Sequence, residues 1–535
     1  MDTEALIGKV QSVDTGNISV KVDKEELLNS AQINQIVQIR STKTGEKIIG
    51  LISKIMRKAV ADKIDESSEP DFIVENLIKV NLVGTLLEKS GTVKNVFKRT
   101  LNTVPSINAD CFLLQGDELS NFMNIISSDS KNPLKIGKYT ISEMSDTNLD
   151  GNKFFQRHAV IVGGTGSGKS WTVANILEKA TKLKSINSLV FDLHGEYKPL
   201  AGIVNKSSIT DNSTEHPKLK NTTLLKIAGP SDKPTDENII FLPYWLLSYE
   251  EIEALLLDRS DSNAPNQSRT LFDLIIKHKK AKLEEEEKQD MLNNFTVESP
   301  IPYRISNVLS ALEEKDTEMV PGARTEKQGP LHGKLTRFIQ RLKSKQSDKR
   351  LNFLFNSDED LLKYNWFLSL VNKLLDFGNN KGLKIIDFSE VPSDILPLIT
   401  GLIGRLIFSI QQWMEDVKRH PIALFCDEAH LYIPANLKGG IEEKGLQSFE
   451  RIAKEGRKYG ISLVVISQRP SDVNKTILSQ CGNFIAMRLT NPDDQNVIKR
   501  LFPDNLGDFS DTTNFRYWRS FNCRRCFIAP KQSYN

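Results

Sequence analysis

The first 130 residues alternate apolar and polar positions over short distances. Runs such as residues 18–22 and 48–52 are rich in β-branched side chains, and turn residues, for example Asp-Thr-Gly-Asn at 14–17, separate them. A period of two predicts strands with one buried face. Several such strands at close spacing predict a small β-barrel over residues 1–130. The stretch holds no catalytic constellation, so we interpret it as a structural or docking module.

From residue 131 the pattern changes to short apolar runs that alternate with helical periodicity. Runs that read as buried strands lie at 159–162, 188–192, 384–388, 422–426, 463–467 and 484–489. Val173, Ile176, Leu177 and Ala180 fall on one face of a helix. Alternating strands and helices predict an α/β domain with a parallel sheet over residues 131–512.

Residues 203–375 interrupt this rhythm. Helical segments at 249–257 and 269–280 lead us to interpret the region as a mainly helical insertion in the α/β domain. Basic side chains gather between residues 334 and 350. They fit a solvent-exposed helix face at least as well as a phosphate-contacting surface, so both alternatives stay open.

Composition narrows the class of protein only in part. The chain has 535 residues, 26% charged and 39% hydrophobic, which indicates a globular protein of two or more domains. Its net charge of +3 neither indicates nor excludes a nucleic-acid partner. The apolar stretch 395–413 contains Arg405, so we expect a helix buried in the protein and no membrane partner. Five cysteines without a disulfide framework, and no signal peptide after Met1, indicate a cytoplasmic protein.

Residues 163–170 match G-x-x-x-x-G-K-[ST], the phosphate-binding loop of a nucleoside triphosphatase. The loop follows a predicted strand and opens a predicted helix, which aims backbone N–H groups and a helix N-terminus at a phosphate. We expect Lys169 to bridge the β- and γ-phosphates and the Ser170 hydroxyl to bind Mg²⁺. ATP and Mg²⁺ are therefore the predicted cofactors, and the predicted ATP-binding residues are Gly163, Gly164, Thr165, Gly166, Ser167, Gly168, Lys169, Ser170 and Trp171.

A second motif follows the apolar run at 422–426, which leads into Asp427 and Glu428. Such a pair is typical of a Walker B strand, with Asp427 in the Mg²⁺ shell and Glu428 polarising the attacking water. A helix cap is the alternative. The phosphate loop upstream in the same domain favours the catalytic interpretation. Gln468 ends the next strand, where an amide can contact both the γ-phosphate and the attacking water.

Polar residues also follow the run at 188–192. Asp192 and Glu196 stand past the end of a predicted parallel strand, where α/β proteins place their sites. Loop structure alone explains them equally well.

Taken together, these signals resemble the HerA/FtsK group of DNA-translocating ATPases, and the HerA family most closely. The resemblance covers roughly residues 1–200 and 380–512. It rests on these segments: Arg157-His158, the phosphate loop, Asp192-Leu193-His194-Gly195-Glu196-Tyr197, Ile386-Asp387-Phe388-Ser389, Asp427-Glu428-Ala429-His430, Glu455-Gly456-Arg457-Lys458-Tyr459-Gly460 and Ser467-Gln468-Arg469-Pro470.

The resemblance implies an N-terminal barrel, a RecA-like motor domain with a helical insertion, and a homo-hexameric ring around double-stranded DNA. It also implies a partner, either a nuclease or a sirtuin-like effector. Arg157 matches an arginine close to the phosphates. Arg457 matches best the finger that reaches a neighbouring subunit's ATP, and Arg451 is the second choice.

Residues 513–535 depart from the family pattern. From Thr512 onward there is no Asp or Glu, while four Arg, one Lys and two Cys occur. Reading plausible codons for residues 514–520 one base later gives Ile-Leu-Asp-Thr-Gly-Glu, which resembles the family's continuation, so we hypothesise a frameshift near residue 513. Cys523-x-x-Cys526 lacks a second ligand pair, which disfavours a zinc site.

Three functions are compatible with these motifs. The first is a ring motor that hydrolyses ATP to move duplex DNA. The second is a ring scaffold in which ATP switches a partner effector. The third is a two-lobed helicase, prompted by Asp427-Glu428-Ala429-His430, but the chain has one phosphate-loop domain and no obvious second lobe.

Overall fold

The computed structural model describes residues 5–61, 72–88, 95–98, 100–126, 132–138, 146–183, 186–202, 219, 221–322, 325–375, 382–437, 439–501 and 526–530. The chain divides into two compact units, one of residues 1–154, 161–179 and 482–535 and the other of residues 155–160 and 180–481. No helix within the described ranges is long and apolar enough to cross a membrane.

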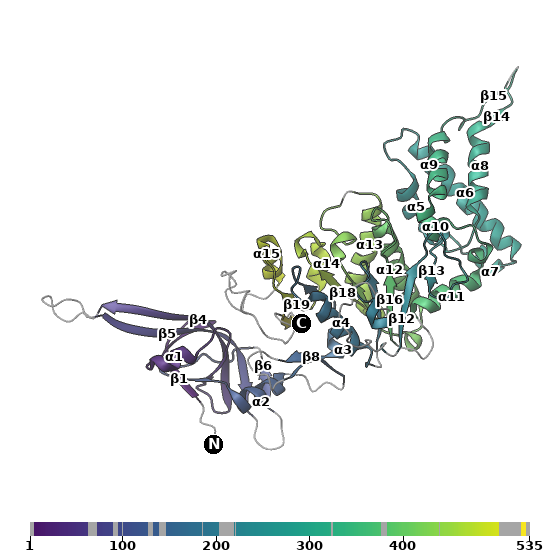
Figure 1. The fold of residues 1–535 in the computed structure, drawn as a ribbon. Coiled ribbons are helices and arrows are strands. Elements are labelled where there is room, and N and C mark those ends of the chain that lie inside the picture. The colour runs from purple at the N-terminus through teal and green to yellow at the C-terminus, as the bar shows by residue number, and fades with distance from the viewer. Residues whose placement is uncertain are drawn as a thin grey trace, which may run out of the picture. The chain divides into compact units, whose positions relative to one another are not determined.

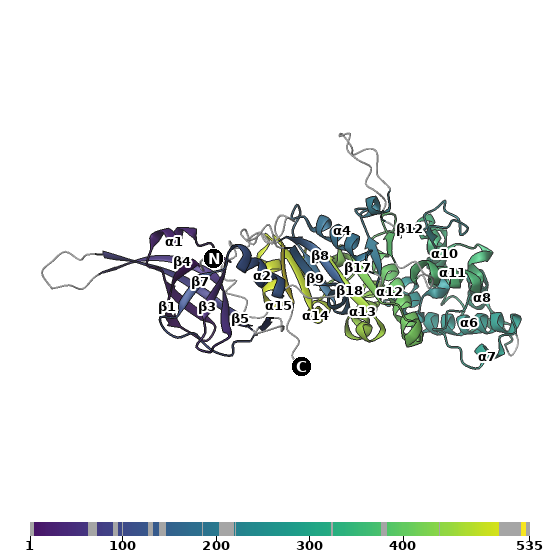
Figure 2. The same cartoon turned by 90° about the horizontal axis from the view of Figure 1, so that it is seen from below.

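Six N-terminal strands close into a barrel, as the alternating pattern predicts (Figure 2). The elements are β1 (Ala5–Val13), β2 (Asn17–Lys21), α1 (Glu25–Ser30), β3 (Ile36–Arg40), β4 (Glu46–Ala61), β5 (Phe72–Leu87), β6 (Val96–Lys98) and β7 (Asp110–Leu113). The strand order is β2-β1-β7-β3-β4-β5-β6, and an additional pairing between β2 and β5 closes the ring. Inward residues such as Val10, Val20, Val37 and Val80 are completely buried in its core.

Strands β4 and β5 are longer than the sequence pattern indicates. Each has 16 residues, and their hairpin extends well beyond the other strands of the barrel (Figure 1). The pairing shifts register between Ile49 and Gly50 and again between Ile52 and Lys54. A Cβ at Gly50 would lie 2.4 Å from Val80 Cγ1, so only glycine fits where the two strands approach there.

The α/β part of the chain is built on a largely parallel sheet, as predicted. Its strands are β10 (Ala159–Val162), β11 (Asn187–Asp192), β12 (Thr222–Ile227), β13 (Ile239–Ile240), β16 (Leu383–Asp387), β17 (Ile422–Cys426), β18 (Ile461–Ser467), β19 (Asn483–Met487) and β20 (Cys526–Pro530). Their order is β13-β12-β16-β11-β17-β18-β10-β19-β20. Strands β10, β11, β16, β17 and β18 are buried at every position, which explains why their sequences are largely apolar runs.

Outside residues 203–375, the other α-helices and strands are α2 (Gly116–Ile126), β8 (Pro133–Lys138), β9 (Asp146–Asp150), α3 (Gly151–Gln156), α4 (Lys169–Ala180), α12 (Leu396–Trp413), α13 (Ile441–Glu455), α14 (Lys475–Gln480) and α15 (Pro492–Leu501). Helix α12 corresponds to the apolar stretch 395–413, for which the sequence predicts a buried helix. Arg405 in it pairs with Glu251 at 2.7 Å, which explains a charge in an otherwise apolar helix. Helices α12 and α13 meet at two glycines, since a Cβ on Gly401 would lie 2.5 Å from Gly445 Cα.

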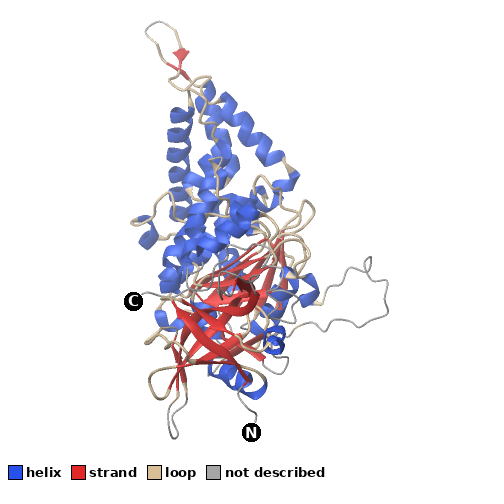
Figure 3. Ribbon diagram, turned by 90° about the vertical axis from the view of Figure 1, so that its left-hand side faces the viewer, coloured by secondary structure: helices blue, strands red, loops and turns tan. Residues whose placement is uncertain are grey.

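Residues 203–375 hold a helical cluster, seen among the blue helices of Figure 3. Its elements are α5 (Tyr249–Leu256), α6 (Ala264–Glu285), α7 (Gln289–Leu292), α8 (Ile305–Thr317), β14 (Met319–Val320), β15 (Lys327–Gln328), α9 (Thr336–Ser347), α10 (Asn352–Phe355) and α11 (Tyr364–Leu375). The same interval also supplies β12 and β13 to the main sheet, which the helical interpretation did not anticipate. In register, Thr222 to Lys226 lie beside Leu383 to Asp387.

The basic stretch between residues 334 and 350 begins just before α9, covers the helix and ends just after it. Arg341 bonds Asp258 at 3.0 Å, Lys343 bonds Glu313 at 2.5 Å, and Arg350 bonds Asp348 at 2.7 Å. These ion pairs favour the exposed helix face over a phosphate-binding surface.

The tail lies largely outside the described residues. Cys526 begins β20, which pairs antiparallel with β19. Cys523 and the segment around residue 513 are not among the described residues, so the frameshift stays a hypothesis.

Candidate nucleotide site

The phosphate loop connects β10 to α4. All four residues of β10 are buried, and Lys169 begins α4 with its side chain largely covered. Val173, Ile176, Leu177 and Ala180 form the buried face of α4, as their spacing predicts. Gly166 has φ +70° and Gly168 φ +93°, which are left-handed conformations that favour glycine. The backbone thus turns from a buried strand into a helix N-terminus, the geometry that binds phosphate.

The loop is packed against the end of β19. Gly164 donates a hydrogen bond to the Arg488 carbonyl at 2.9 Å. A Cβ at Gly163 would lie 2.4 Å from Ser167 Oγ and 2.8 Å from Met487 Cβ, so a larger residue would push the loop away. Ser167 Oγ also contacts Met487 Sδ at 3.7 Å. The sequence motif did not reveal this support from Met487.

The other predicted nucleotide-binding residues differ in exposure. Thr165 and Gly166 are exposed, and Gly168 and Ser170 are partly exposed. Trp171 is 76% exposed on α4. The structure alone therefore assigns no contact to Trp171, whose role stays a prediction.

The acidic pair follows β17, as predicted. Asp427 is 1% exposed and Glu428 is 4% exposed. Glu428 has φ 43° and ψ 45°, a left-handed conformation that is uncommon for a residue with a side chain. Such backbone strain is found mainly at functional sites, where the surroundings hold it in place.

Gln468 and His430 both contact the Glu428 carboxylate. Gln468 Nε2 donates to Glu428 Oε1 at 2.5 Å, and His430 Nδ1 lies 3.4 Å from Glu428 Oε2. Ser467 Oγ is 3.3 Å from the same His430 nitrogen. The structure thus joins Gln468 to Glu428, two residues that the sequence assigned to one reaction. It adds His430, which the sequence analysis quoted but gave no role.

Asp192 stabilises the loop that follows β11. Its carboxylate accepts hydrogen bonds from the backbone N–H groups of Glu196 and Tyr197, both at 3.0 Å. Burial raises the pKa of Asp192, and these hydrogen bonds oppose the rise. The contacts favour the structural alternative for Asp192.

Two candidate arginines differ in their surroundings. Arg451 stacks over the Phe408 ring, 4.4 Å from its centroid, and donates to Gln412 Oε1 at 3.2 Å. Arg457 is exposed in the turn before Gly460 and makes no ion pair with any residue that the structure describes. Arg457 is therefore available to a neighbouring molecule, whereas Arg451 is held within its own chain.

Arg157 and His158 precede β10. Arg157 is partly exposed, and its place near a phosphate stays a prediction. His158 is 5% exposed and accepts a hydrogen bond from the Leu463 backbone N–H at 2.9 Å. Burial and the charge of Arg457 lower the pKa of His158 to about 4, and a backbone hydrogen bond with Ala453 opposes this shift. His158 is therefore a neutral residue that completes the hydrogen bonding of β18.

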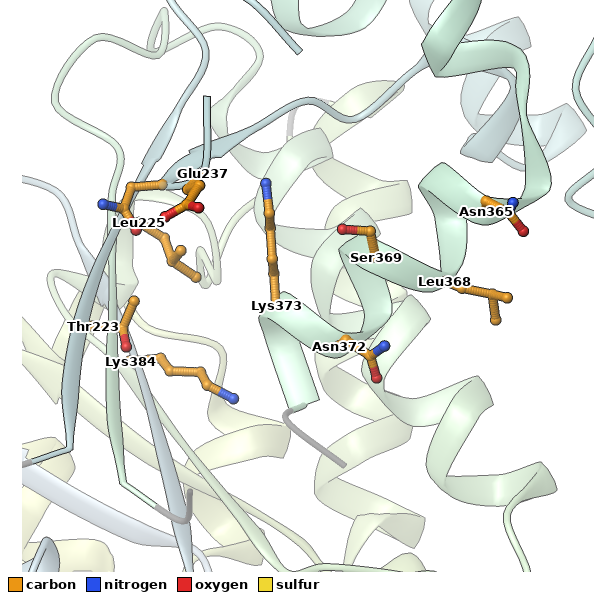
Figure 4. A pocket seen from close by; sticks show the side chains of 10 residues that line it. Thr223, Leu225, Glu237, Asn365, Leu368, Ser369, Asn372, Lys373 and Lys384 are labelled. Atoms are coloured by element: carbon orange, nitrogen blue, oxygen red, sulfur yellow. The ribbon is translucent and has the colours of Figure 1, made fainter. Parts of the chain in front are cut away.

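A separate groove of about 550 Å³ lies between α11 and strands β12 and β16 (Figure 4). Lys384 there contacts the Leu374 carbonyl at 3.4 Å, and Lys373 contacts the Ile239 carbonyl at 3.3 Å. The groove contains none of the predicted nucleotide-binding residues.

The predicted metal ligands are oxygen donors. Asp427 follows β17 with a buried carboxylate, and Mg²⁺ prefers oxygen ligands of this kind. A shared Mg²⁺ site of Asp427 and the Ser170 hydroxyl stays a prediction. A phosphate loop with an acidic strand end and a glutamine on the neighbouring strand defines a P-loop ATPase.

Comparison with known protein families identifies the family of P-loop ATPases to which the chain belongs. The family "Helicase HerA, central domain" matches residues 134–407, and "Helicase HerA-like C-terminal" matches residues 407–506. The first match alone spans 274 of 535 residues. The chain belongs to the HerA helicase family, as the sequence motifs indicated.

Individual relatives are distant. A probable helicase of Methanocaldococcus jannaschii is 26% identical over 389 residues, which cover 70% of this chain and 61% of that protein. A second probable helicase of the same organism is 23% identical over 532 residues, covering 92% and 88%. The DNA double-strand break repair helicase HerA of Pyrococcus furiosus is 23% identical over 430 residues, covering 74% and 67%. The chain thus spans between 61% and 88% of these relatives.

Among solved structures, VirB4 of Thermoanaerobacter pseudethanolicus matches with a TM-score of 0.45 and 13% identity. The match covers 76% of this chain and 98% of that one.

Proposed function

We propose that this protein is an ATP-driven translocase that acts on double-stranded DNA as a homo-hexamer. The contact between Gln468 and Glu428 carries the proposal, because it joins a candidate water-activating carboxylate to a candidate γ-phosphate sensor in a HerA-family chain. A buried carboxylate beside an amide is suited to hold and polarise a water molecule.

In this mechanism the loop N–H groups and Lys169 bind the phosphates. Ser170 and Asp427 would hold Mg²⁺, which would neutralise charge on the phosphate oxygens when bound. Glu428 orients the attacking water, and Gln468 senses the γ-phosphate through the same carboxylate.

The hexamer is proposed because one site residue is available in trans. Arg457 is exposed and makes no ion pair within the described part of the chain, so it can reach a neighbouring subunit's nucleotide. Native mass spectrometry with nucleotide should show six copies. Only monomers at micromolar concentration, with nucleotide and partner present, would count against the ring.

Several relatives are named as DNA double-strand break repair helicases. On this basis we propose duplex DNA as the substrate, and DNA end processing or antiphage defence, with a nuclease or sirtuin-like effector, as the setting.

The test is the ATPase rate with and without duplex DNA, for the wild type and for Glu428→Gln. A translocase requires ATP hydrolysis that duplex DNA stimulates and that Glu428→Gln abolishes. It should also displace a roadblock that is bound to the duplex. Hydrolysis that responds to a partner protein but never to DNA would support the ATP-switched scaffold instead.

A further inference from the structure

Four lysines lie across neighbouring strands β1, β2, β5 and β4 of the barrel. Lys9 is directly opposite Lys21 in the β1–β2 pair, and Lys54 is directly opposite Lys79 in the β4–β5 pair. Strand β2 also pairs with β5, where Leu77 is opposite Lys21, so Lys21 and Lys79 are diagonal neighbours. We call these four side chains the lysine row.

The lysine row lies on the outer surface of the barrel. All four residues are exposed. The residues on either side of Lys9, Lys21 and Lys79 are buried, for example Val20 and Val22, and those beside Lys54 are half-buried. Successive residues of a strand point to opposite faces, so residues between core positions point outward. Within the unit that contains the barrel, the lysine row is therefore exposed and accessible to a partner.

No ion pair neutralises the lysine row among the described residues. Asp110 is opposite Lys9 but bonds Arg40 at 3.4 Å, and Glu75 is opposite another lysine, Lys58. Like charges directly opposite one another destabilise a sheet. Two such pairs side by side therefore oppose folding in the free chain, and an anionic partner laid across them would reverse that effect.

We propose that the lysine row binds the phosphate backbone of duplex DNA, as a contact on the barrel additional to the ATPase domain. Strands lie about 4.8 Å apart, so the row spans about 14 Å across four strands. The same length holds about four phosphates of one DNA strand at ~3.4 Å of helix axis each. This inference rests on the proposed DNA-translocating function.

The chemistry of the row favours DNA over an acidic protein. Lysine binds phosphate as a point charge and reads no base, which suits movement along any sequence. A protein partner would instead need an apolar anchor at the centre of the surface. Ser19, which is opposite Lys79, lies within the row, and Leu77 beside it is buried.

The test compares two charge-matched variants of the full chain, each bound to a non-hydrolysable ATP analogue. The first carries Lys9→Gln, Lys21→Gln, Lys54→Gln and Lys79→Gln. The control carries Lys277→Gln, Lys280→Gln, Lys288→Gln and Lys349→Gln, which are exposed lysines of the other unit. Affinity for a duplex is measured over a range of salt concentrations.

Each lost phosphate contact reduces the log–log salt slope by about 0.9, so the row variant should lose up to ~3.6 and the control far less. Equal slopes in both variants would overturn the lysine row while leaving the proposed function intact. If the wild type itself fails to bind duplex DNA, the proposed function fails first.

Lysine acylation of the wild type provides a readout that needs no variant. Duplex DNA should protect the four row lysines but not Lys277 or Lys349, as measured by mass spectrometry. Equal labelling with and without DNA would overturn the proposal, and so would protection by an acidic partner protein but not by DNA.

Discussion

Gln468 Nε2 donates a hydrogen bond to Glu428 Oε1 at 2.5 Å, and both side chains follow adjacent parallel strands. The amide engages the carboxylate that we expect to activate water. A residue that contacts both the base and the nucleotide can report which nucleotide is bound. The relationship therefore predicts that Glu428 and Gln468 affect turnover far more than nucleotide affinity.

Glu428→Gln should retain ATP binding and lose hydrolysis. The substitution keeps the shape of the side chain and its hydrogen bond to Gln468 but removes the basic oxygen. A general base contributes about 10²–10⁴ in rate, so kcat should fall by that range. Glu415→Gln, at an exposed position, is the matched control. Near-normal turnover in Glu428→Gln would show that another group activates the water.

Gln468→Glu should change the pH dependence of kcat. It places a second carboxylate beside Glu428, and two such groups in contact share a proton because one pKa rises. The acidic limb of the kcat profile should therefore move to higher pH, by at least about one unit. Gln468→Met, which removes the hydrogen bond without adding charge, should lower kcat with no such movement. Identical pH profiles for the two variants would separate Gln468 from Glu428 in function.

The sequence predicts the central sheet well because its strands are buried on both faces. Residues 159–162 are an unbroken apolar run, and the structure has β10 over those residues. Strands that carry polar or charged side chains are harder to predict from the sequence. Strand β12 contains Thr222, Thr223 and Lys226 and follows a long polar stretch, so its pattern resembles a loop. Strand β4 carries Lys54, Arg57 and Lys58 beyond residue 53, and these charges conceal its length.

The candidate site, like the fold, has features that the sequence predicts and features that it does not. The sequence motif identifies Lys169 and Ser170 because phosphate binding by such a loop depends on residues at a fixed local spacing. Contacts between distant segments are set by packing, which no local pattern encodes. The stacking of Arg451 on Phe408 and the support of the phosphate loop by Met487 belong to this second group.

Arg457→Ala should retain nucleotide binding while turnover collapses. An arginine supplied in trans is worth about 10³–10⁵ in rate because it neutralises charge that develops on the γ-phosphate. Rings mixed from Arg457→Ala and Glu428→Gln subunits should regain partial activity, since some interfaces then pair an intact Arg457 with an intact Glu428. Arg451→Ala is the control, and we expect a smaller effect because Arg451 packs on its own chain. Mixed rings without any rescue would argue against a shared site.

His158 should make the stability of β18 depend on pH. The pKa of His158 is lowered from 6.5 to about 4 by burial, so its contribution is complete above pH 6.5 and is lost as pH falls from 6.5 towards 4, where only the unfolded chain takes up the proton. At pH 5 the loss is ~2 kcal/mol. Hydrogen exchange of a peptide covering residues 461–467, corrected for the intrinsic rate, should lose protection between pH 7 and pH 5. His158→Gln keeps an acceptor for the Leu463 N–H and should flatten this dependence, whereas His332→Gln should not. Equal pH dependence in the wild type and His158→Gln would show that His158 is not the titrating group.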